Sequence, residues 1–206
     1  MINLISNKAI NNFLSILRNK ETPSNDFRNA LNIISMGLAF EISNTINSKQ
    51  IKITTPIEQA TCDVYDEELI LLPILRSGLG MLNSFTTIFP SAKIEYQALS
   101  KTENNYEISG LYSSYGAINP KAKIIILEPM IATGNTLCTA IDSLRMNGAQ
   151  EIVIASIISA PAGVEKVITQ FPEINIYSCA LDEELTYNSF ISPGLGDVGN
   201  RINGTI

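Results

Sequence analysis

The sequence predicts an α/β fold with a mostly parallel central sheet and helices on both faces. Residues 69–75 and 124–127 are continuous apolar runs, which are typical of strands buried on both faces. From residue 122 onward, strands alternate with segments of helical periodicity: strand 122–127, helix 135–147, strand 151–158, helix 162–171 and strand 174–180. In sheets of this kind, ligands bind at the carboxyl ends of the strands.

The N-terminal part, residues 1–45, is expected to contribute a pair of helices that pack outside the sheet. Apolar residues recur at helical spacing in 7–20 and again in 25–45, and Thr22-Pro23-Ser24 separates the two segments. Residues 51–54 and 58–64 resemble short extended pieces without an evident role. After the apolar run 69–75, we expect a helix that ends near Ile88 and a strand at 93–99.

Two segments lack a firm period. Residues 100–121 are polar and contain tyrosines, and we expect a flexible lid or hairpin over the site, because compact domains rarely keep long idle loops. Residues 182–206 form a tail that is punctuated by glycines. We interpret residues 1–206 as one domain, since the length suits a single α/β core.

The composition is that of a folded soluble protein, with 45% hydrophobic and 17% charged residues. A net charge of −6 argues against binding to nucleic acid or to an anionic membrane, so any phosphate site must be local. The start of the chain lacks a signal-peptide pattern, and no window is long and apolar enough for a membrane span. We therefore expect a cytoplasmic protein.

The chain contains no histidine, which excludes a Ser-His-Asp triad, imidazole acid–base catalysis and histidine-containing zinc sites. Its three cysteines, Cys62, Cys138 and Cys179, are far apart and form no CxxC pair. This spacing indicates neither a metal cluster nor a disulfide framework, and it suits a reducing cytosol.

Residues 124–136 combine a buried strand with a loop that suits an anion. Backbone N–H groups of 133–136 would be free at a helix start, where the helix dipole favours an anion, and Thr133 and Thr136 add hydroxyl donors. Glu128 would repel phosphate, but its carboxylate would accept hydrogen bonds from the hydroxyls of a sugar phosphate. An ordinary strand-to-helix turn is an equally good interpretation of this stretch alone.

Arg76 follows the buried run 69–75 directly, in a turn with Gly78. A guanidinium in this place could clamp a diphosphate in a bidentate manner, while the glycine lets backbone amides come close. The alternative is a surface arginine in a loop. A permanent charge directly after an apolar run favours the functional interpretation.

The tail contains Gly194-Leu-Gly-Asp-Val-Gly199, which formally matches the dinucleotide fingerprint GxGxxG. Only seven residues follow Gly199, too few for the βαβ unit that the fingerprint requires. The glycines could instead present bare peptide groups to a planar heterocycle; the alternative is a frayed terminus. Lys101 in the expected lid could close over an anion, although a lone lysine in a polar loop is more often only solvated.

Together these stretches resemble the uracil phosphoribosyltransferase family, a type I phosphoribosyltransferase family. Residues 73–81 are similar to its pyrophosphate loop and 124–136 to its phosphoribosyl diphosphate (PRPP) motif. Residues 159–164 resemble the segment after the next strand, and 191–205 resemble the uracil-binding tail, the most specific of the four. The implied fold is phosphoribosyltransferase-like, with a flexible hairpin and a C-terminal hood over the base.

The resemblance implies that Arg76, Lys101 and Asp197 are the catalytic residues. PRPP would be bound by these three residues and by Glu128, Pro129, Met130, Ile131, Ala132, Thr133, Gly134, Asn135 and Thr136. Uracil would be framed by Ile191, Gly196, Asp197 and Val198 through main-chain contacts. Mg²⁺ would arrive with PRPP or diphosphate, without assigned metal ligands in the protein. The resemblance also implies a homodimer or larger homo-oligomer, and GTP as an effector, to which family members can respond.

Four positions depart from the usual family pattern. Glu128 and Lys101 stand where the family usually has Asp and Arg, so their charges are kept but their reach differs. Asn135 replaces Gly and adds a side chain to the PRPP motif. Asn200 replaces Asp and removes a charge near the base site.

The leading hypothesis is transfer of the 5-phosphoribosyl group from PRPP to N1 of uracil, which gives UMP and diphosphate in pyrimidine salvage. Arg76, Lys101 and Mg²⁺ would stabilise the departing diphosphate, and no covalent nucleophile is required. Asp197 or main-chain polarisation of uracil are the candidates for the base. The four departures motivate an alternative, a PRPP- or nucleotide-sensing regulator with the same fold. A kinase or NTP-binding module is the weakest hypothesis, because the chain lacks GxxxxGK[ST].

Overall fold

The computed structural model describes the backbone of residues 1–101 and 108–205, and the side chains of 1–99 and 112–205. In this described part, nine strands form one sheet in the order β1-β11-β10-β8-β4-β6-β7, with β5 beside β4 and β9 beside β10. These strands are β1 (Ile2–Leu4), β4 (Leu69–Leu75), β5 (Lys93–Ile94), β6 (Gln97–Lys101), β7 (Ile108–Ser113), β8 (Lys123–Leu127), β9 (Met130–Ile131), β10 (Glu151–Ser159) and β11 (Asn175–Leu181). All pairs are parallel except β6 with β7.

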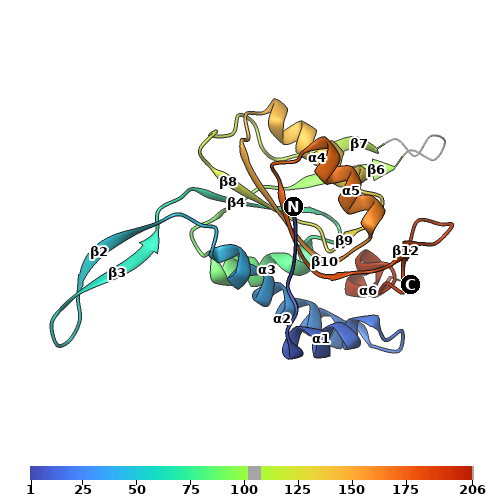
Figure 1. Ribbon diagram of the computed structural model, residues 1–206, viewed down its shortest axis with the longest axis horizontal. Coiled ribbons are helices and arrows are strands. Elements are labelled where there is room, and N and C mark those ends of the chain that lie inside the picture. Colours follow the sequence, from blue (N-terminus) through green and yellow to red (C-terminus); the bar gives the residue numbers. More distant parts are fainter. Residues whose placement is uncertain (102–107, 206) are drawn as a thin grey trace.

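Helices cover both faces of the sheet, as predicted. The described helices are α1 (Lys8–Arg18), α2 (Ser24–Ser43), α3 (Leu79–Ile88), α4 (Asn135–Met146), α5 (Pro161–Gln170) and α6 (Val198–Asn203). In Figure 1, α4 and α5 lie on one side of the sheet, and α1, α2 and α3 lie on the other. The predicted strand-and-helix alternation from residue 122 to 180 is therefore confirmed, with boundaries that differ by at most one residue.

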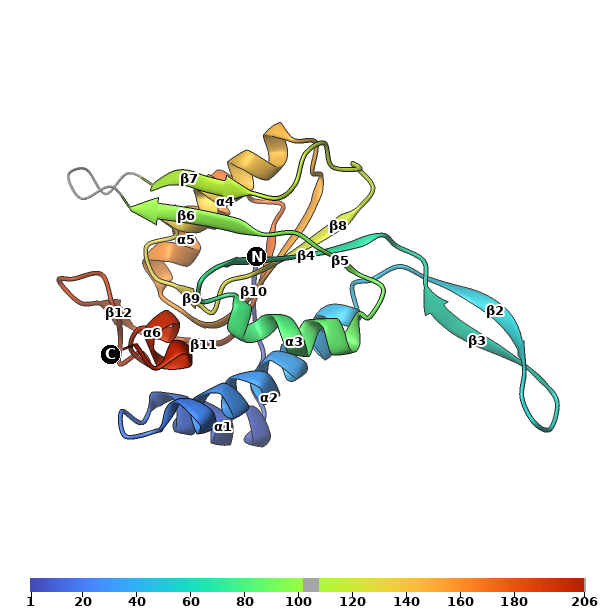
Figure 2. The ribbon, with the colours of Figure 1, turned by 180° about the vertical axis from the view of Figure 1, so that it is seen from behind.

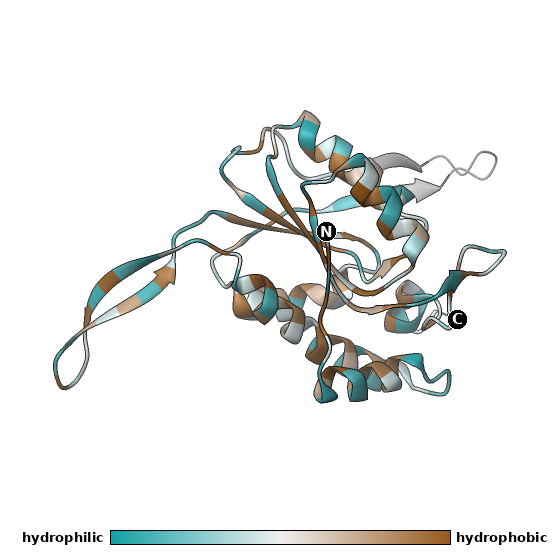
Figure 3. Ribbon diagram, viewed as in Figure 1, coloured by the Kyte–Doolittle hydropathy of each residue, from teal (hydrophilic) through white to brown (hydrophobic). Residues whose placement is uncertain are grey.

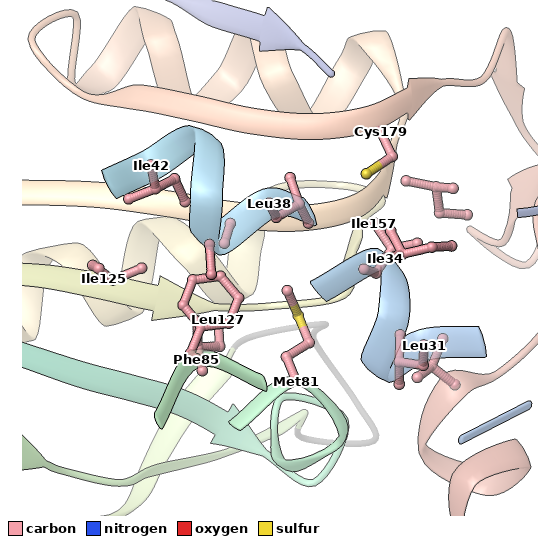
Figure 4. Packing of buried hydrophobic residues seen from close by; sticks show 14 of the residues in the cluster. Leu31, Ile34, Leu38, Ile42, Met81, Phe85, Ile125, Leu127, Ile157 and Cys179 are labelled. Atoms are coloured by element: carbon pink, nitrogen blue, oxygen red, sulfur yellow. The ribbon is translucent and has the colours of Figure 1, made fainter. Parts of the chain in front are cut away.

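The two apolar runs divide their side chains between two cores. Leu69, Leu71, Ile125 and Leu127 face the core under α1, α2 and α3, and the alternate residues of the same strands face the core under α4 and α5. A strand that is covered on both faces needs apolar residues at every position, which is why these runs are continuous. The hydropathy colours of Figure 3 show the same apolar centre of the sheet, and Figure 4 shows α2 and α3 packing on β8, β10 and β11.

Local signals fix several helix ends. The side chain of Asn7 accepts a hydrogen bond from the Ile10 N–H at 2.9 Å and caps α1. Pro161 occupies the first turn of α5, where no N–H is needed. The predicted stop at Asn147-Gly148 is confirmed, because α4 ends at Met146 and Gly148 has a φ of 102°.

In the N-terminal part, one feature differs from the expectation and another completes it. Residues 1–45 do not consist of helices alone, because Ile2–Leu4 pair in parallel with Ile176–Ser178 of β11 and extend the sheet. The extended pieces beyond α2 are β2 (Ser48–Thr54) and β3 (Gln59–Tyr65), which form one antiparallel hairpin. Figure 2 shows that this hairpin reaches away from the body of the molecule.

The segment 100–121 divides into parts with different surroundings. β6 and β7 form an antiparallel pair, and the expected lid residues 102–107 lie outside the described residues. Residues 114–121 are attached to the body: Tyr115 and Ile118 are buried, and the Tyr115 hydroxyl hydrogen-bonds the Ser143 hydroxyl of α4 at 3.0 Å. A lid would therefore have to come from the hairpin alone, and that role stays a prediction. No described helix is both long and apolar enough to cross a membrane.

Candidate active site

A cavity of about 320 Å³ lies at the carboxyl ends of β4 and β8. These two strands are neighbours, but the chain leaves β4 for α3 on one face and β8 for α4 on the other. Loops that diverge in this way open a crevice between them, which is where open α/β sheets bind ligands. The lining residues are Ile74, Leu75, Ser77, Leu99, Glu128, Met130, Ile131, Ala132, Thr133, Gly134, Thr136, Leu137, Asn188, Ser189, Phe190, Ile191 and Asp197.

The loop before α4 is shaped by two glycines. Gly134 has a φ of 77°, and a Cβ atom at this position would lie 2.7 Å from the Gly163 carbonyl oxygen. A Cβ atom at Gly163 would lie 2.3 Å from the Ala132 carbonyl oxygen. Only glycine allows this close approach between the loop and α5. Gly134 is the N-cap of α4 and has no side chain that could cap the helix. The Asn135 N–H makes a long contact of 3.5 Å with the Thr133 hydroxyl, and the next amides of the first turn point toward the side where a ligand can bind.

Glu128 lies at the junction of the two strand ends. Its side chain is 7% exposed, and one carboxylate oxygen accepts a hydrogen bond from the Ser77 hydroxyl at 3.1 Å. Its backbone N–H donates to the Ala155 carbonyl oxygen of β10 at 3.1 Å. Ser77 thus orients the carboxylate and β10 fixes the backbone of Glu128, which lines the cavity and can accept hydrogen bonds from ligand hydroxyl groups.

Arg76 follows β4 and has an exposed side chain. Its guanidinium donates to the Asn200 side-chain oxygen at 3.2 Å, which places it beside α6. Asp197 caps the same helix by accepting the Asn200 N–H at 2.8 Å. The structure therefore brings Arg76 and Asp197 to the same edge of the cavity. Gly78 has an internal role: a Cβ atom there would lie 2.3 Å from the Leu127 carbonyl oxygen.

The C-terminal tail is firmly attached, which excludes the frayed terminus. Arg18 of α1 donates to both carboxylate oxygens of Asp182, at 2.7 and 2.6 Å, and to the Gly194 carbonyl oxygen at 2.8 Å. Burial disfavours the charged form of Asp182, but hydrogen bonds from Arg18 and the Gly194 N–H outweigh it and lower the pKa of this carboxyl group. Gly194 is thereby held through both its N–H and its carbonyl group.

Arg201 makes a second attachment of the tail. Its guanidinium donates to the carbonyl oxygens of Leu195 at 2.9 Å and Asn19 at 2.6 Å, and also to that of Leu17. The same guanidinium lies 4.2 Å above the ring centroid of Phe27. Both attachments connect the tail to the N-terminal helices, far away in sequence.

Most of the predicted site residues lie together. Those that line the cavity are Glu128, Met130, Ile131, Ala132, Thr133, Gly134, Thr136, Ile191 and Asp197. Pro129 lies behind the wall, where its carbonyl oxygen accepts the N–H groups of Ile157 and Ile158. The Val198 side chain is fully buried in the core, and Gly196 and Asn135 flank the lining. The side chain of Lys101 lies outside the described residues.

The turn 186–190 belongs to the site, although none of its residues was among the predicted site residues. β12 (Glu184–Leu185) pairs antiparallel with β13 (Ile191–Ser192), and the turn between them presents Asn188, Ser189 and Phe190 to the cavity. Ser189 has a φ of 62°, and its N–H donates to the Thr186 carbonyl oxygen at 2.8 Å. The polar and aromatic stretch Thr186-Tyr-Asn-Ser-Phe190 directly precedes the predicted base-binding segment, and this position in the sequence could have indicated that it belongs to the site. The other lining residues that were not predicted are Ile74, Leu75, Ser77, Leu99 and Leu137.

The cavity combines two chemical environments. One part has the Glu128 carboxylate, the hydroxyls of Thr133 and Thr136 and the start of α4, which suit a ligand with hydroxyls and a phosphate. Phe190 and Ile191 line another part beside Asp197, and they suit a flat group with a polar edge. The lining therefore suits a ligand that combines hydroxyls, a phosphate and a flat group.

Solved structures first define the class of protein. The purine phosphoribosyltransferase from Pyrococcus horikoshii Ot3 is 14% identical, with a TM-score of 0.51 and coverage of 75% of this chain and 87% of that one. The fold is thus that of the phosphoribosyltransferases. A far more similar structure is that of the AQ2163 protein from Aquifex aeolicus, with 28% identity, a TM-score of 0.91 and coverage of 98% and 97%.

The sequence comparisons are more specific than the fold. Residues 4–205 match the family model "Uracil phosphoribosyltransferase". Relatives named uracil phosphoribosyltransferase include those from Streptococcus salivarius, 36% identical, and Salinibacter ruber, 34% identical. These matches cover 98% and 99% of this chain, respectively, and 97% of each relative. The chain belongs to the uracil phosphoribosyltransferase family.

Proposed function

We propose that this protein transfers the 5-phosphoribosyl group from PRPP to N1 of uracil and releases UMP and diphosphate, a reaction of pyrimidine salvage. The observation that carries the proposal is the shared cavity: the loop before α4 and the C-terminal tail line one space at the ends of β4 and β8. Donor and acceptor can therefore be held next to each other, which supplies much of the rate enhancement in a reaction between two substrates.

The donor would bind along β8 and the start of α4. The 5′-phosphate accepts hydrogen bonds from the free amides and from the hydroxyls of Thr133 and Thr136. Glu128 accepts the ribose hydroxyls, with its carboxylate oriented by Ser77. Pro129 contributes by closing the wall behind the loop.

The acceptor would lie against the tail. Ile191 and residues 196–198 offer main-chain groups to the edge of uracil, and because the Val198 side chain is buried, only its backbone can take part. The Asp197 carboxylate accepts one hydrogen bond from the Asn200 N–H, which caps α6, and it can accept further hydrogen bonds from a ligand. Asp197 or the main-chain contacts are the candidates for taking up or weakening the N1 proton.

The diphosphate would leave on the side of Arg76. Its guanidinium has five N–H donors, and the neutral side chain of Asn200 accepts from only one of its nitrogens, so the charge is available for an anion. Lys101 at the end of β6 is proposed as a second cation on the basis of family resemblance.

The donor set is compatible with Mg²⁺ that enters with the diphosphate. Among the described residues, no group of three or more His, Cys, Asp or Glu side chains could hold a metal, and the cavity lining has two carboxylates, Glu128 and Asp197. Mg²⁺ commonly takes one or two protein carboxylates and completes its shell with phosphate and water. When bound, it would neutralise charge on the departing diphosphate.

Two further parts of the proposal follow from family resemblance. They are a homodimer or larger homo-oligomer and GTP as an effector, whereas a cytoplasmic location is proposed from the spacing of the cysteines. The regulatory alternative gains no support from the relatives, whose names are those of an enzyme.

Incubation with PRPP, Mg²⁺ and labelled uracil tests the proposed reaction. We expect labelled UMP, and Arg76→Ala should lower turnover by about two orders of magnitude or more, as is typical for loss of a charge-stabilising donor. The exposed Arg76 packs little, so the variant should stay folded. Tight PRPP binding without UMP formation by the wild type would contradict the enzyme and favour the regulatory alternative. Equal UMP formation by both proteins would contradict the role of Arg76.

A further inference from the structure

The charges around the cavity do not match its proposed anionic ligand. The described lining has two carboxylates, Glu128 and Asp197, and no Lys or Arg side chain. The chain as a whole has a net charge of −6. Arg76 supplies positive charge beside α6, at the edge near Asp197 and Asn200. The backbone amides and threonine hydroxyls at the start of α4 can bind a phosphate, but no cationic side chain of the described lining neutralises its charge there.

Lys166 of α5 does not line the cavity itself, but its ammonium group lies next to the start of α4. Gly163 lies in the first turn of α5 in close backbone contact with Ala132 and Gly134 of the cavity wall. Lys166 is three residues later, and residues at this spacing share one face of a helix. Its ammonium donates a hydrogen bond to the side-chain oxygen of Asn135, the first residue of α4. Asn135 itself stands between Gly134 and Thr136, which both line the cavity.

The charge of Lys166 acts on this part of α4 and is not neutralised there. Within the described part of the chain, Lys166 forms no ion pair, and its side chain is exposed. Burial raises the pKa of the Cys138 thiol, and the positive charge of Lys166 acts on the same thiol in the opposite direction. The negative charge of Asp142 opposes that of Lys166, because it raises the pKa of the same thiol. Asp142 is itself engaged by Gln170, whose side-chain amide donates a hydrogen bond to its carboxylate at 3.3 Å.

We propose, on the basis of the function proposed above, that Lys166 is the phosphate-binding cation of this site and that Asn135 holds it in place. An ammonium group has three donors, and Asn135 occupies one, so the others remain for phosphate oxygens. A free lysine side chain loses considerable rotamer entropy when it is fixed, and a contact that is already formed reduces this cost on binding. A glycine at position 135 could not make the contact.

The test compares ligands that differ only in the phosphate. Affinities of UMP and uridine are measured by calorimetry for the wild type, Lys166→Met and Lys166→Arg. We expect Lys166→Met to weaken UMP binding about three- to tenfold, the range for an exposed charge-assisted contact, and to leave uridine binding unchanged. Lys166→Arg keeps the charge and should retain most of the affinity. In steady state, the KM for PRPP should rise while kcat stays the same, since the phosphate is remote from the reacting carbon.

Two further variants isolate the contact with Asn135. Asn135→Ala should weaken UMP binding in the same direction, and the double variant Asn135→Ala/Lys166→Met should be no weaker than Lys166→Met alone. Lys121→Met is the matched control, because Lys121 is exposed before the amino end of β8 and its loss changes the net charge equally.

The outcomes separate this inference from the proposed function. If the wild type bound UMP no better than uridine, the proposed site for the phosphate would be wrong. Should the wild type prefer UMP and Lys166→Met keep the same preference, only the role of Lys166 would be overturned. An equal loss in Lys121→Met would mean that net charge alone is responsible, which also overturns it.

Discussion

The loop before α4 and the C-terminal tail face the same cavity, but different interactions hold them in place. The loop follows a fully buried strand, and its shape depends on Gly134 and Gly163, which touch backbone against backbone. The tail is attached by the guanidinium groups of Arg18 and Arg201, which reach carbonyl and carboxylate oxygens. The loop is therefore shaped by steric fit, and the tail by directed polar contacts that a single substitution can release.

This difference predicts separate effects on the two substrates. Damage to the loop should affect PRPP binding and stability together, because the loop is part of the close-packed core. Damage to the tail attachments should affect uracil more than PRPP, because the sheet and α4 stay as they are. Two substitutions with different expected effects, one in the loop and one in the tail, test this distinction.

The larger effect is expected from Gly134→Ala. The new Cβ would lie 2.7 Å from the Gly163 carbonyl oxygen at a φ of 77°, so the loop or α5 must move. We expect a loss of about 3 kcal/mol in the free energy of unfolding, from the left-handed backbone and the steric overlap together, and a large loss of PRPP affinity. Denaturant unfolding and calorimetry with PRPP measure the two quantities.

Gly116→Ala is the matched control for this substitution. A Cβ atom at Gly116 would have no neighbour within 4 Å, and we expect a change below about 0.5 kcal/mol. A Gly134→Ala protein as stable as the control, with normal PRPP binding, would refute the steric explanation of the loop.

A smaller effect is expected from Asp182→Asn in the tail. This change removes the ion pair between Asp182, whose side chain is 5% exposed, and Arg18, whose side chain is 26% exposed. It should lower the free energy of unfolding by about 2 kcal/mol. The KM for uracil should rise while the affinity for PRPP stays within about twofold, because the donor side is not touched. Asp66→Asn breaks the exposed pair with Lys49 and serves as the control, with an expected cost below about 0.5 kcal/mol.

The pH dependence of the same pair has a defined sign. The pKa of Asp182 is lowered in the folded protein, so its carboxylate stabilises the fold above the unfolded pKa of about 3.9 and loses this effect as the pH falls through the folded pKa. The stability difference between wild type and Asp182→Asn should be constant near neutral pH and shrink in the acid range. A difference that grows on acidification would contradict the ion pair as its cause.

The difference between the loop, which is shaped by local sequence, and the tail, which is attached by distant residues, explains what the sequence could predict. Buried strands β4 and β8 and the start of α4 carry local signals, because a run of apolar residues or a glycine turn is visible within about ten residues. The first strand was missed because Ile2–Leu4 is only three residues long and pairs with Ile176–Ser178 at the other end of the chain. The two extended pieces near residue 55 were seen, but their pairing into a hairpin was not.

In the site, too, local features were predictable and contacts between distant residues were not. Glycines of the tail indicated a base-binding segment, but its attachment depends on Arg18 and Phe27, which no local pattern connects with residues 182–201. The departure at Asn135 was visible as an added side chain, whereas its contact with Lys166 spans 31 residues and required the structure. Residues that meet only through the fold leave no mark in a single sequence.

A crystal structure of the complex with UMP would test most directly whether the two halves of the cavity bind the two parts of one nucleotide. We predict that the phosphate lies at the start of α4, against Thr133 and Thr136, and that the uracil ring lies between Ile191 and the main chain of 196–198. Glu128 should accept hydrogen bonds from the ribose hydroxyls between them. A nucleotide bound with its base at α4, or outside this cavity, would contradict the assignment of donor and acceptor sides.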